Sequence, residues 1–284
     1  MRCLNRYIVL TLAIVGIVMF STGCKKDKNP DTGKPLLIAS SIEVNSSNPK
    51  DTAQQYYFSY DNNNRLTKLV SKLSTYAALT YNFSYDANSN MTRYTMETQG
   101  VLQEIHAFTY NNGLPVKRVD SGISAINSPA VWTYYYSYSD NNNNLIINAK
   151  YNVADGNRVE GDTIIYKNNN QLYWGQGLAD STYQGTVTGI NTSTYTFGSR
   201  RGPYSSINLK QFISSAFPIV NDNEILTSSG SLQTIDYYAH PVFLTDPNSY
   251  TYVYNSAGYA ISATGIDQKT LSTYVTYFRY IPSH

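Results

Sequence analysis

The sequence has 284 residues, of which only 14% are charged and 28 are Tyr, and its formal net charge is +2. A charged fraction well below the usual ~25%, without the Ala, Glu, Lys and Leu enrichment of long helices, excludes a coiled coil. A hydrophobic content of 42% excludes a charged disordered chain, and the lack of a basic block excludes the electrostatic footprint of a nucleic-acid partner.

The N-terminus has the pattern of a secretory signal. Two Arg residues precede an apolar run from Tyr7 to Phe20, which fits a signal-peptide core and is short for a membrane span of about 20 residues. The small residues Ser21 to Gly23 followed by Cys24 resemble a bacterial lipobox, at which the signal is cleaved and the Cys is lipidated. We therefore predict a lipoprotein signal peptide over residues 1–23 and lipid attachment at Cys24, with an ordinary signal peptide as the alternative.

Cleavage changes the charge and the cysteine content. It removes Arg2, Arg6 and Cys3, so the mature chain keeps 19 basic and 19 acidic residues and a single cysteine, Cys24. That leaves no disulfide and no cysteine metal site. Residues 24–35 are expected to form the lipidated Cys and a polar, flexible tether with a reach of about 18 Å. The predicted location is the outer membrane, as a lipoprotein that faces the periplasm or the cell surface.

Tyrosine-rich units recur along residues 36–284. In the clearest unit Tyr56, Phe58 and Tyr60 alternate with polar residues, so their side chains share one face of a strand. Asp61 to Asn64 then has the composition of a turn, and a second strand follows. Later units begin at Tyr81, His106, Tyr134, Thr163 and Tyr250. We predict a single all-β domain over 36–284, an antiparallel meander of long hairpins that forms a curved sheet or a closed, barrel-like structure.

One segment departs from this pattern. Apolar residues at Leu209, Phe212, Ile213, Ala216 and Phe217 follow helical spacing. Ser205 or Ser206 can cap the start, and Pro218 ends the pattern. The spacing predicts one short helix near 205–217, which would cover an open end or an edge of the sheet.

The repeats carry two family resemblances. Tyr60-Asp61 and Arg65-Leu66 resemble the tyrosine-aspartate (YD) repeats of bacterial secreted shell proteins. The region 36–281 is similar to a family of Bacteroidota lipoproteins of unknown function, described as all-β and porin-like, with the likeness concentrated in Gly202–Asn208 and Tyr250–Tyr259. The second resemblance implies a fold and an envelope location without an activity.

The distribution of Tyr bears on the relation to the membrane. A membrane-spanning barrel confines its aromatic residues to two interfacial girdles, and a Tyr hydroxyl is costly at the midplane. Here Tyr occurs throughout the expected strands. We therefore expect a water-soluble meander with Tyr and Phe directed inward rather than a spanning pore.

The sequence carries no strong catalytic, cofactor or metal motif, and we expect none of these sites. His106 occupies the aromatic position of a repeat, which favours a packed strand residue over a ligand. The spacing of Asp86–Asn90 with Glu97 matches part of a calcium loop, but Met91 stands where the sharp turn requires Gly. A turn followed by a strand is the better interpretation.

The remaining candidates are the aromatic residues Trp132, Tyr173 and Trp174. Exposed Trp and Tyr stack on sugar rings and anchor protein interfaces, although burial in the core is the alternative. We predict a lipid-anchored cell-envelope protein with a non-catalytic binding or structural role. Its partners would be the membrane, through the anchor, and a glycan or an envelope protein. The alternatives are an accessory component of an envelope complex and, third, a hydrolase.

Overall fold

The computed structural model describes residues 35–74, 76–122, 130–141, 144–152, 158–180, 188–207, 221–235 and 241–284. The predicted signal peptide, Cys24 and nearly all of the tether lie outside these residues. The described part of the chain contains sixteen strands and no helix. The strands are β1 (Leu36–Asn45), β2 (Asn48–Tyr60), β3 (Leu66–Leu73), β4 (Leu79–Tyr85), β5 (Met91–Thr98), β6 (Val101–Asn111), β7 (Leu114–Gly122), β8 (Ala130–Asn141), β9 (Asn144–Asn152), β10 (Arg158–Lys167), β11 (Asn170–Asp180), β12 (Thr188–Arg201), β13 (Asn223–Ile235), β14 (Pro241–Tyr254), β15 (Ala260–Asp267) and β16 (Thr273–Pro282). Within the described ranges, no helix is both long and apolar enough to cross a bilayer.

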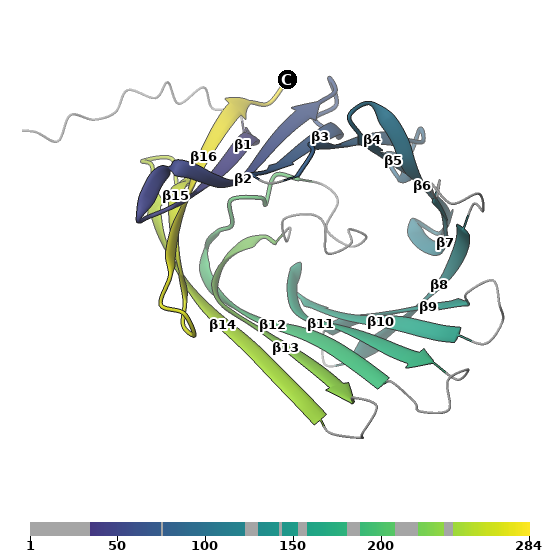
Figure 1. Ribbon diagram of the computed structural model, residues 1–284. Helices are drawn as coiled ribbons and strands as arrows, with labels where there is room; N and C mark the ends of the chain where they lie inside the picture. Colours follow the sequence, from purple (N-terminus) through teal and green to yellow (C-terminus); the bar gives the residue numbers. More distant parts are fainter. Residues whose placement is uncertain are drawn as a thin grey trace, which may run out of the picture. The chain divides into compact units, whose positions relative to one another are not determined.

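The strands form one closed antiparallel barrel. Each strand pairs with its neighbours in the chain, and β1 pairs with β16 from Leu36 opposite Pro282 to Asn45 opposite Tyr274. Figure 1 shows the ring of strands, with the N-terminal and C-terminal strands side by side. The all-β antiparallel meander is confirmed, and of the two expected forms the chain adopts the closed one.

Three hairpins turn in the same way, which explains the repeated Asp and Asn of the sequence. In each, a side-chain oxygen of the first turn residue accepts hydrogen bonds from the backbone N–H groups two and four positions later, at 2.8–3.1 Å. The first residues are Asp61, Asp86 and Asn255. The fourth residues, which adopt positive φ, are Asn64, Ser89 and Gly258. A bulge follows each turn in the strand register, the expected companion of a left-handed turn residue.

The last Tyr of each early repeat joins one hairpin to the one before it. The hydroxyl of Tyr85 donates to the carbonyl of Leu66 at 2.7 Å, two residues before Lys68, which is the first residue of β3 that pairs with β4. A carbonyl beyond the end of the β3–β4 ladder has no partner in β4, so the hydroxyl supplies a hydrogen bond there. The same bond recurs from Tyr60 to Ile38, from Tyr110 to Met91 and from Tyr138 to Pro115.

The hydrophobic core lies on the inner face of the barrel. Ile38, Leu69 and Tyr81 are almost completely buried and belong to one cluster built from β1–β6, β15 and β16. The alternating aromatics Tyr56, Phe58 and Tyr60 all contribute to it, as their spacing predicts. The inner face therefore takes most of the aromatic side chains, and the turns take the Asn and Asp.

Residues Gly202–Ile207, called here the plug segment, follow β12 and pack inside the barrel (Figure 1). The Tyr204 ring contacts the rings of Phe58 and Phe278, and its hydroxyl donates to Ser41 at 2.9 Å. Gly202 is buried so tightly against the backbone carbonyls of Asn221 and Asn223 that a Cβ would collide with them. This segment opens one of the two stretches that carry the lipoprotein-family resemblance.

The predicted helix near 205–217 is not present where it would start. Ser205 and Ser206 lie in consecutive turns, with hydrogen bonds from the N–H of Ser205 to Gly202 and from that of Ile207 to Tyr204. The Ser206 hydroxyl accepts from the N–H of Ile38 instead of capping a helix. Residues 208–217 lie outside the described residues.

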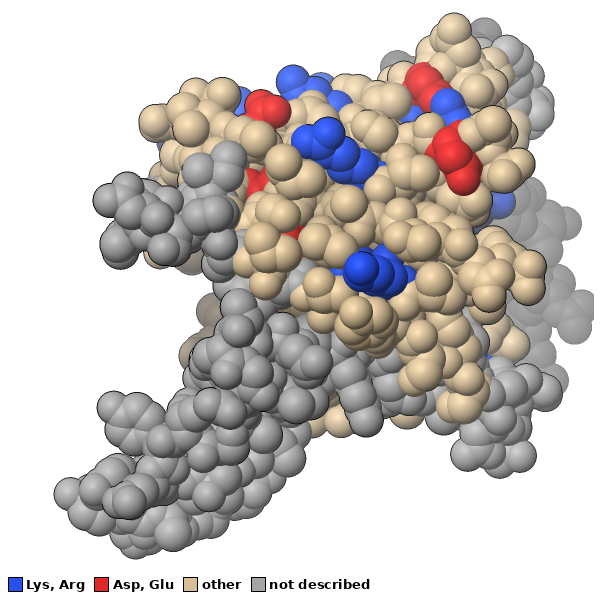
Figure 2. All heavy atoms as spheres, turned by 90° about the vertical axis from the view of Figure 1, so that its right-hand side faces the viewer, with Lys and Arg blue, Asp and Glu red and all other residues tan. Residues whose placement is uncertain are grey.

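The described outer face of the barrel carries charged side chains beside exposed apolar ones such as Val131 and Val253. Lys68 and Arg93 are exposed, and the next residue on each strand, Leu69 on β3 and Tyr94 on β5, is buried on the inner face. Figure 2 shows Lys, Arg, Asp and Glu side chains distributed over the outer face on the right-hand side of Figure 1. Two exposed Tyr rings on this outer face lie beneath Lys side chains, Tyr57 beneath Lys72 and Tyr135 beneath Lys117.

Candidate functional site

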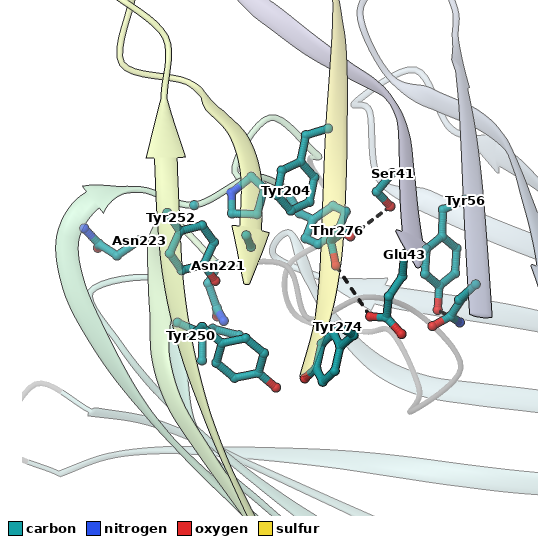
Figure 3. A pocket seen from close by; sticks show the side chains of 16 residues that line it. Ser41, Glu43, Tyr56, Tyr204, Asn221, Asn223, Tyr250, Tyr252, Tyr274 and Thr276 are labelled. Atoms are coloured by element: carbon teal, nitrogen blue, oxygen red, sulfur yellow. Dashed lines mark hydrogen bonds between the residues drawn. The ribbon is translucent and has the colours of Figure 1, made fainter. Parts of the chain in front are cut away.

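A cavity of about 230 Å³ opens inside the barrel between the plug segment and the walls formed by β1, β2 and β13–β16. Six of its sixteen described lining residues are aromatic: Tyr56, Tyr204, Tyr250, Tyr252, Tyr274 and Phe278. Figure 3 shows the five Tyr rings together with Glu43, Asn221 and Thr276. Burial raises the pKa values of Tyr204, Tyr252 and Tyr274 above the ordinary value, so these hydroxyls stay neutral at neutral pH.

The rings of Tyr250 and Tyr274 are placed by strand register. Both residues stand opposite Gly265, on either side of β15. Because Gly265 has no side chain, the Tyr274 ring lies directly across it, where a Cβ would overlap the ring. Tyr250 meets Tyr274 edge to face, with ring centroids 6.4 Å apart and an interplanar angle of 71°. The pair forms a fixed aromatic wall beside the cavity.

Glu43 of β1 supplies the acidic group of the cavity. Its carboxylate accepts a long hydrogen bond from the Thr276 hydroxyl at 3.5 Å. Burial raises its pKa above the ordinary value, partly offset by that hydrogen bond. Gln54 donates to the Tyr56 hydroxyl, and burial together with the neighbouring Tyr81 and Glu43 raises the pKa of Tyr56 to about 12.

Asn221 supplies a hydrogen-bond donor without a partner. Its side-chain oxygen accepts from the N–H of Gln171 at 2.8 Å, which fixes the amide, and only 2% of the residue is exposed. Its Nδ2 is buried with no hydrogen-bond partner in the described structure, although the residue lines the cavity. A buried donor costs about 1–3 kcal/mol when unsatisfied, so a ligand oxygen here would bind favourably.

A second polar cluster faces the inside of the barrel on β6 and β7. His106 Nδ1 lies 2.7 Å from Asp120 Oδ1, and its Nε2 lies 3.0 Å from Glu104 Oε2. Arg118 Nε lies 2.9 Å from the same Asp120 oxygen, and the guanidinium stacks 3.8 Å from the centroid of the Tyr134 ring. The cluster is therefore a closed network of ion pairs.

His106 is buried and stacks on Tyr94 with ring centroids 4.1 Å apart, in keeping with the packed strand residue that its repeat position predicts. Burial lowers its pKa, but the hydrogen bonds to Asp120 and Glu104 outweigh this effect and raise the pKa above the ordinary value. Both ring nitrogens face carboxylates. This arrangement stabilises an imidazolium and leaves no nitrogen free to act as a general base.

The three aromatic residues predicted as ligand-facing are not brought together. Through the register of β11–β14, Trp174 shares the inner face with Tyr250, whereas the adjacent Tyr173 lies on the outer face with its ring over Gly175. Neither lines the cavity. The backbone of Trp132 stands opposite Asp120, and its side chain lies outside the described part of the structure.

The Asp86–Asn90 segment forms one of the three equivalent turns. The spacing of these residues predicts a turn followed by a strand in preference to a calcium loop, and the structure agrees. The Asp86 carboxylate accepts hydrogen bonds from the N–H groups of Asn88 and Asn90 and from the Asn90 amide. Glu97 instead accepts from Asn82 on the neighbouring strand at 3.0 Å. Within the described residues, no group of three His, Cys, Asp or Glu side chains is arranged to hold a metal ion.

Sequence reasoning missed Glu43, Asn221 and Tyr274 as site residues. Glu43 lies in β1 outside every repeat unit, and Asn221 comes directly after residues 208–220, also outside the repeat units. The available signal was the Tyr250 repeat, whose alternation places Tyr250 and Tyr252 on the inner face. The hairpin between β15 and β16 places Tyr274 beside that repeat, but only barrel closure brings Glu43 of β1 there.

Comparisons with known proteins support the fold alone. The chain resembles the crystal structure of a porin-like protein from Bacteroides uniformis, with 14% identity and a TM-score of 0.50, over 87% of this chain and 98% of that one. It also resembles a porin-like protein from Bacteroides vulgatus, with 8% identity and a TM-score of 0.51, over 87% of this chain and all of that one. No protein-family profile and no curated protein sequence matches the chain.

Proposed function

We propose that this chain is a lipid-anchored cell-envelope protein that holds a small ligand in the lumen of its barrel without transforming it. The cavity carries the proposal. It combines a fixed aromatic wall, one carboxylate and one buried amide donor without a partner, in a space of about 230 Å³. Small-molecule sites are typically concave, largely aromatic and lined by a few oriented polar groups.

The polar groups of the barrel support a binding role rather than catalysis. Glu43 is the one carboxylate among the described residues that line the cavity, whereas glycoside hydrolysis usually needs a pair. His106 is held by carboxylates on both nitrogens. Neither group has the partner that acid–base or nucleophilic chemistry requires.

The envelope location is supported by the lipobox-like residues that end at Cys24 and by the fold shared with porin-like proteins of Bacteroides. We also propose that the barrel stands outside the bilayer. Many Tyr residues, such as Tyr56 and Tyr274, face the interior of the barrel, so the number of Tyr residues does not decide this question. The exposed Lys68 and Arg93 on the outer face do bear on it, because charge on the lipid-facing side of a membrane barrel costs about 2–4 kcal/mol per Lys or Arg at the midplane.

A binding screen with a matched pair of variants tests the ligand-holding role. The full chain, reconstituted in phosphatidylglycerol nanodiscs, is screened by saturation-transfer NMR against simple sugars, amino alcohols and small peptides. Replacing Tyr274, which lines the cavity, by Ala should weaken any hit about tenfold, since an aromatic contact contributes roughly 0.5–1.5 kcal/mol beyond its buried area. Tyr277→Ala removes an exposed ring from the outer face of the same strand and should leave binding unchanged. A silent screen, or equal losses in both variants, would contradict the proposal.

A further inference from the structure

We propose that the ligand of this cavity carries an ammonium group together with a hydroxyl or carbonyl oxygen. The inference rests on the proposed function, because it names the class of ligand that the same cavity would take. Its support comes from the charge of the lining, the faces of the Tyr rings and the unpartnered amide of Asn221.

The described lining is acidic, because its one carboxyl group is not balanced by a basic side chain. Glu43 is its one ionisable carboxylate, and no Lys, Arg or His belongs to the described lining. In the described part of the chain, Glu43 forms no ion pair, whereas the inward-facing Asp120 contacts both Arg118 and His106. Its one hydrogen bond, from Thr276, is long at 3.5 Å. A partly buried carboxylate with so little compensation favours a positively charged guest.

The aromatic walls favour the same guest. Figure 3 shows Glu43 between Tyr56 and Tyr274, with the Tyr250 ring beside them. Aromatic faces are electronegative, and several such faces around one space attract an ammonium group when water is largely excluded. A neutral sugar could stack on the same rings, but it would leave the charge of Glu43 uncompensated.

The unpartnered amide N–H of Asn221 indicates the second functional group of the ligand. Asn221 Nδ2 is buried without a partner, and its amide is held in place through the bond from the N–H of Gln171. An N–H donor requires an oxygen acceptor. An amino sugar or an amino alcohol satisfies both Glu43 and Asn221, whereas a simple hydrocarbon amine satisfies only the first.

The test compares probes that differ in charge and little else. The first pair is choline and its neutral analogue 3,3-dimethylbutan-1-ol, and the second is glucosamine and glucose. Binding to the full chain is measured by NMR titration in phosphatidylglycerol nanodiscs, with empty nanodiscs as the blank. In at least one pair the charged probe should bind tenfold or more tightly than its neutral partner. Glu43→Gln should remove that preference, and Glu97→Gln, which alters a carboxylate on the outer face of β5, should keep it.

The outcomes separate the two proposals. If neutral probes bind as well as charged ones and Tyr274→Ala weakens them, the ligand-holding function stands and the ammonium inference is overturned. A charge preference that survives Glu43→Gln also overturns the inference, because the charge selectivity then arises elsewhere. If no probe and no member of the wider screen binds, both proposals fail.

Discussion

At the scale of single residues, Tyr serves two purposes on the inner face of the barrel. The Tyr85 hydroxyl donates to the Leu66 carbonyl, where the pairing of β3 with β4 has ended, while its ring packs on the core. Tyr274 instead presents its ring to the cavity, across Gly265. Phe provides the ring without the hydrogen bond, and Ser provides the hydroxyl without the ring. The abundance of Tyr therefore follows from positions that need both.

The buried imidazole of His106 makes stability depend on pH. Its pKa is raised in the folded protein by Asp120 and Glu104, against the effects of burial and of the nearby Arg118. A raised folded pKa means that the protonated form is stabilised, and that this contribution is complete below the ordinary value of about 6.5. The contribution is lost as the pH rises through the raised folded pKa.

We therefore expect the free energy of unfolding to fall as the pH is raised from about 6 through the raised folded pKa of His106. His106→Gln should remove most of that slope, since the change takes away the titrating group. Urea denaturation at a series of pH values measures both proteins. In a background of His240→Gln and His284→Gln, an NMR titration follows His106 alone, and Asp120→Asn should lower its midpoint. A wild-type midpoint at or below the ordinary value would contradict this account.

At the scale of elements, the three hairpin turns share one hydrogen-bonding pattern but carry different residues at the fourth position, where φ is positive. Asn64, Ser89 and Gly258 all adopt φ between 60° and 78° at the fourth turn position. Left-handed backbone costs a residue with a side chain roughly 1–2 kcal/mol, although Asn tolerates it better than most. Ser89 has neither the freedom of Gly nor the tolerance of Asn, so its hairpin is under the most strain of the three.

Replacing Ser89 by Gly should stabilise the protein by about 0.5–1 kcal/mol, because relief of the left-handed strain exceeds the greater chain entropy that Gly loses on folding. The urea midpoint measures the change. Ser84→Gly makes the same substitution on the extended strand β4 of the same hairpin and should destabilise by a similar amount. Gly258→Ala should also destabilise. Equal effects of the two Ser→Gly changes would show that backbone conformation is not the cause.

The strands and turns also show which features of the fold could be predicted from the sequence and which could not. Strand alternation and turn chemistry depend on neighbouring residues, so the inward face at Tyr56–Tyr60 and the turn after it were predictable. Closure depends on β1 meeting β16 across most of the chain, and no local pattern distinguishes a closed barrel from a curved sheet. The apolar spacing at 209–217 suggested a helix that would begin near Ser205, but Ser205 and Ser206 turn inward because Tyr204 and Ile207 pack on the core.

The cavity was less predictable for the same reason. Tyr250 and Tyr252 follow from their repeat, but Glu43 joins them only through the pairing of β1 with β16. Asn221 reaches the cavity because Gly202 lets two backbone segments approach closely. Trp174 was predicted as a ligand-facing residue from its side-chain chemistry alone. The strand register places it on the inner face of the barrel, but it does not line the cavity.

At the scale of the whole molecule, the described part of the barrel packs aromatic side chains inside and carries charged side chains such as Lys68 and Arg93 outside, beside exposed apolar ones such as Val253. We propose above that this barrel stands outside the bilayer, because charge on the lipid-facing side of a membrane barrel is costly. A barrel of this kind would need a separate device to stay at a membrane. The lipobox-like sequence ending at Cys24 and the tether of residues 24–35 would provide it.

Two variants test the anchor and the barrel separately. Cys24→Ser should abolish incorporation of labelled palmitate in cells, whereas Cys3→Ser, which changes a residue of the predicted signal peptide, should leave it intact. Replacing residues 1–24 by a signal peptide with an ordinary cleavage site should release the barrel as a protein that is soluble without detergent, since its outer face carries Lys68 and Arg93. Cell fractionation measures the second result. Persistent labelling of Cys24→Ser would refute lipid attachment at this residue, and a released form that still fractionates with membranes would mean that the barrel itself inserts.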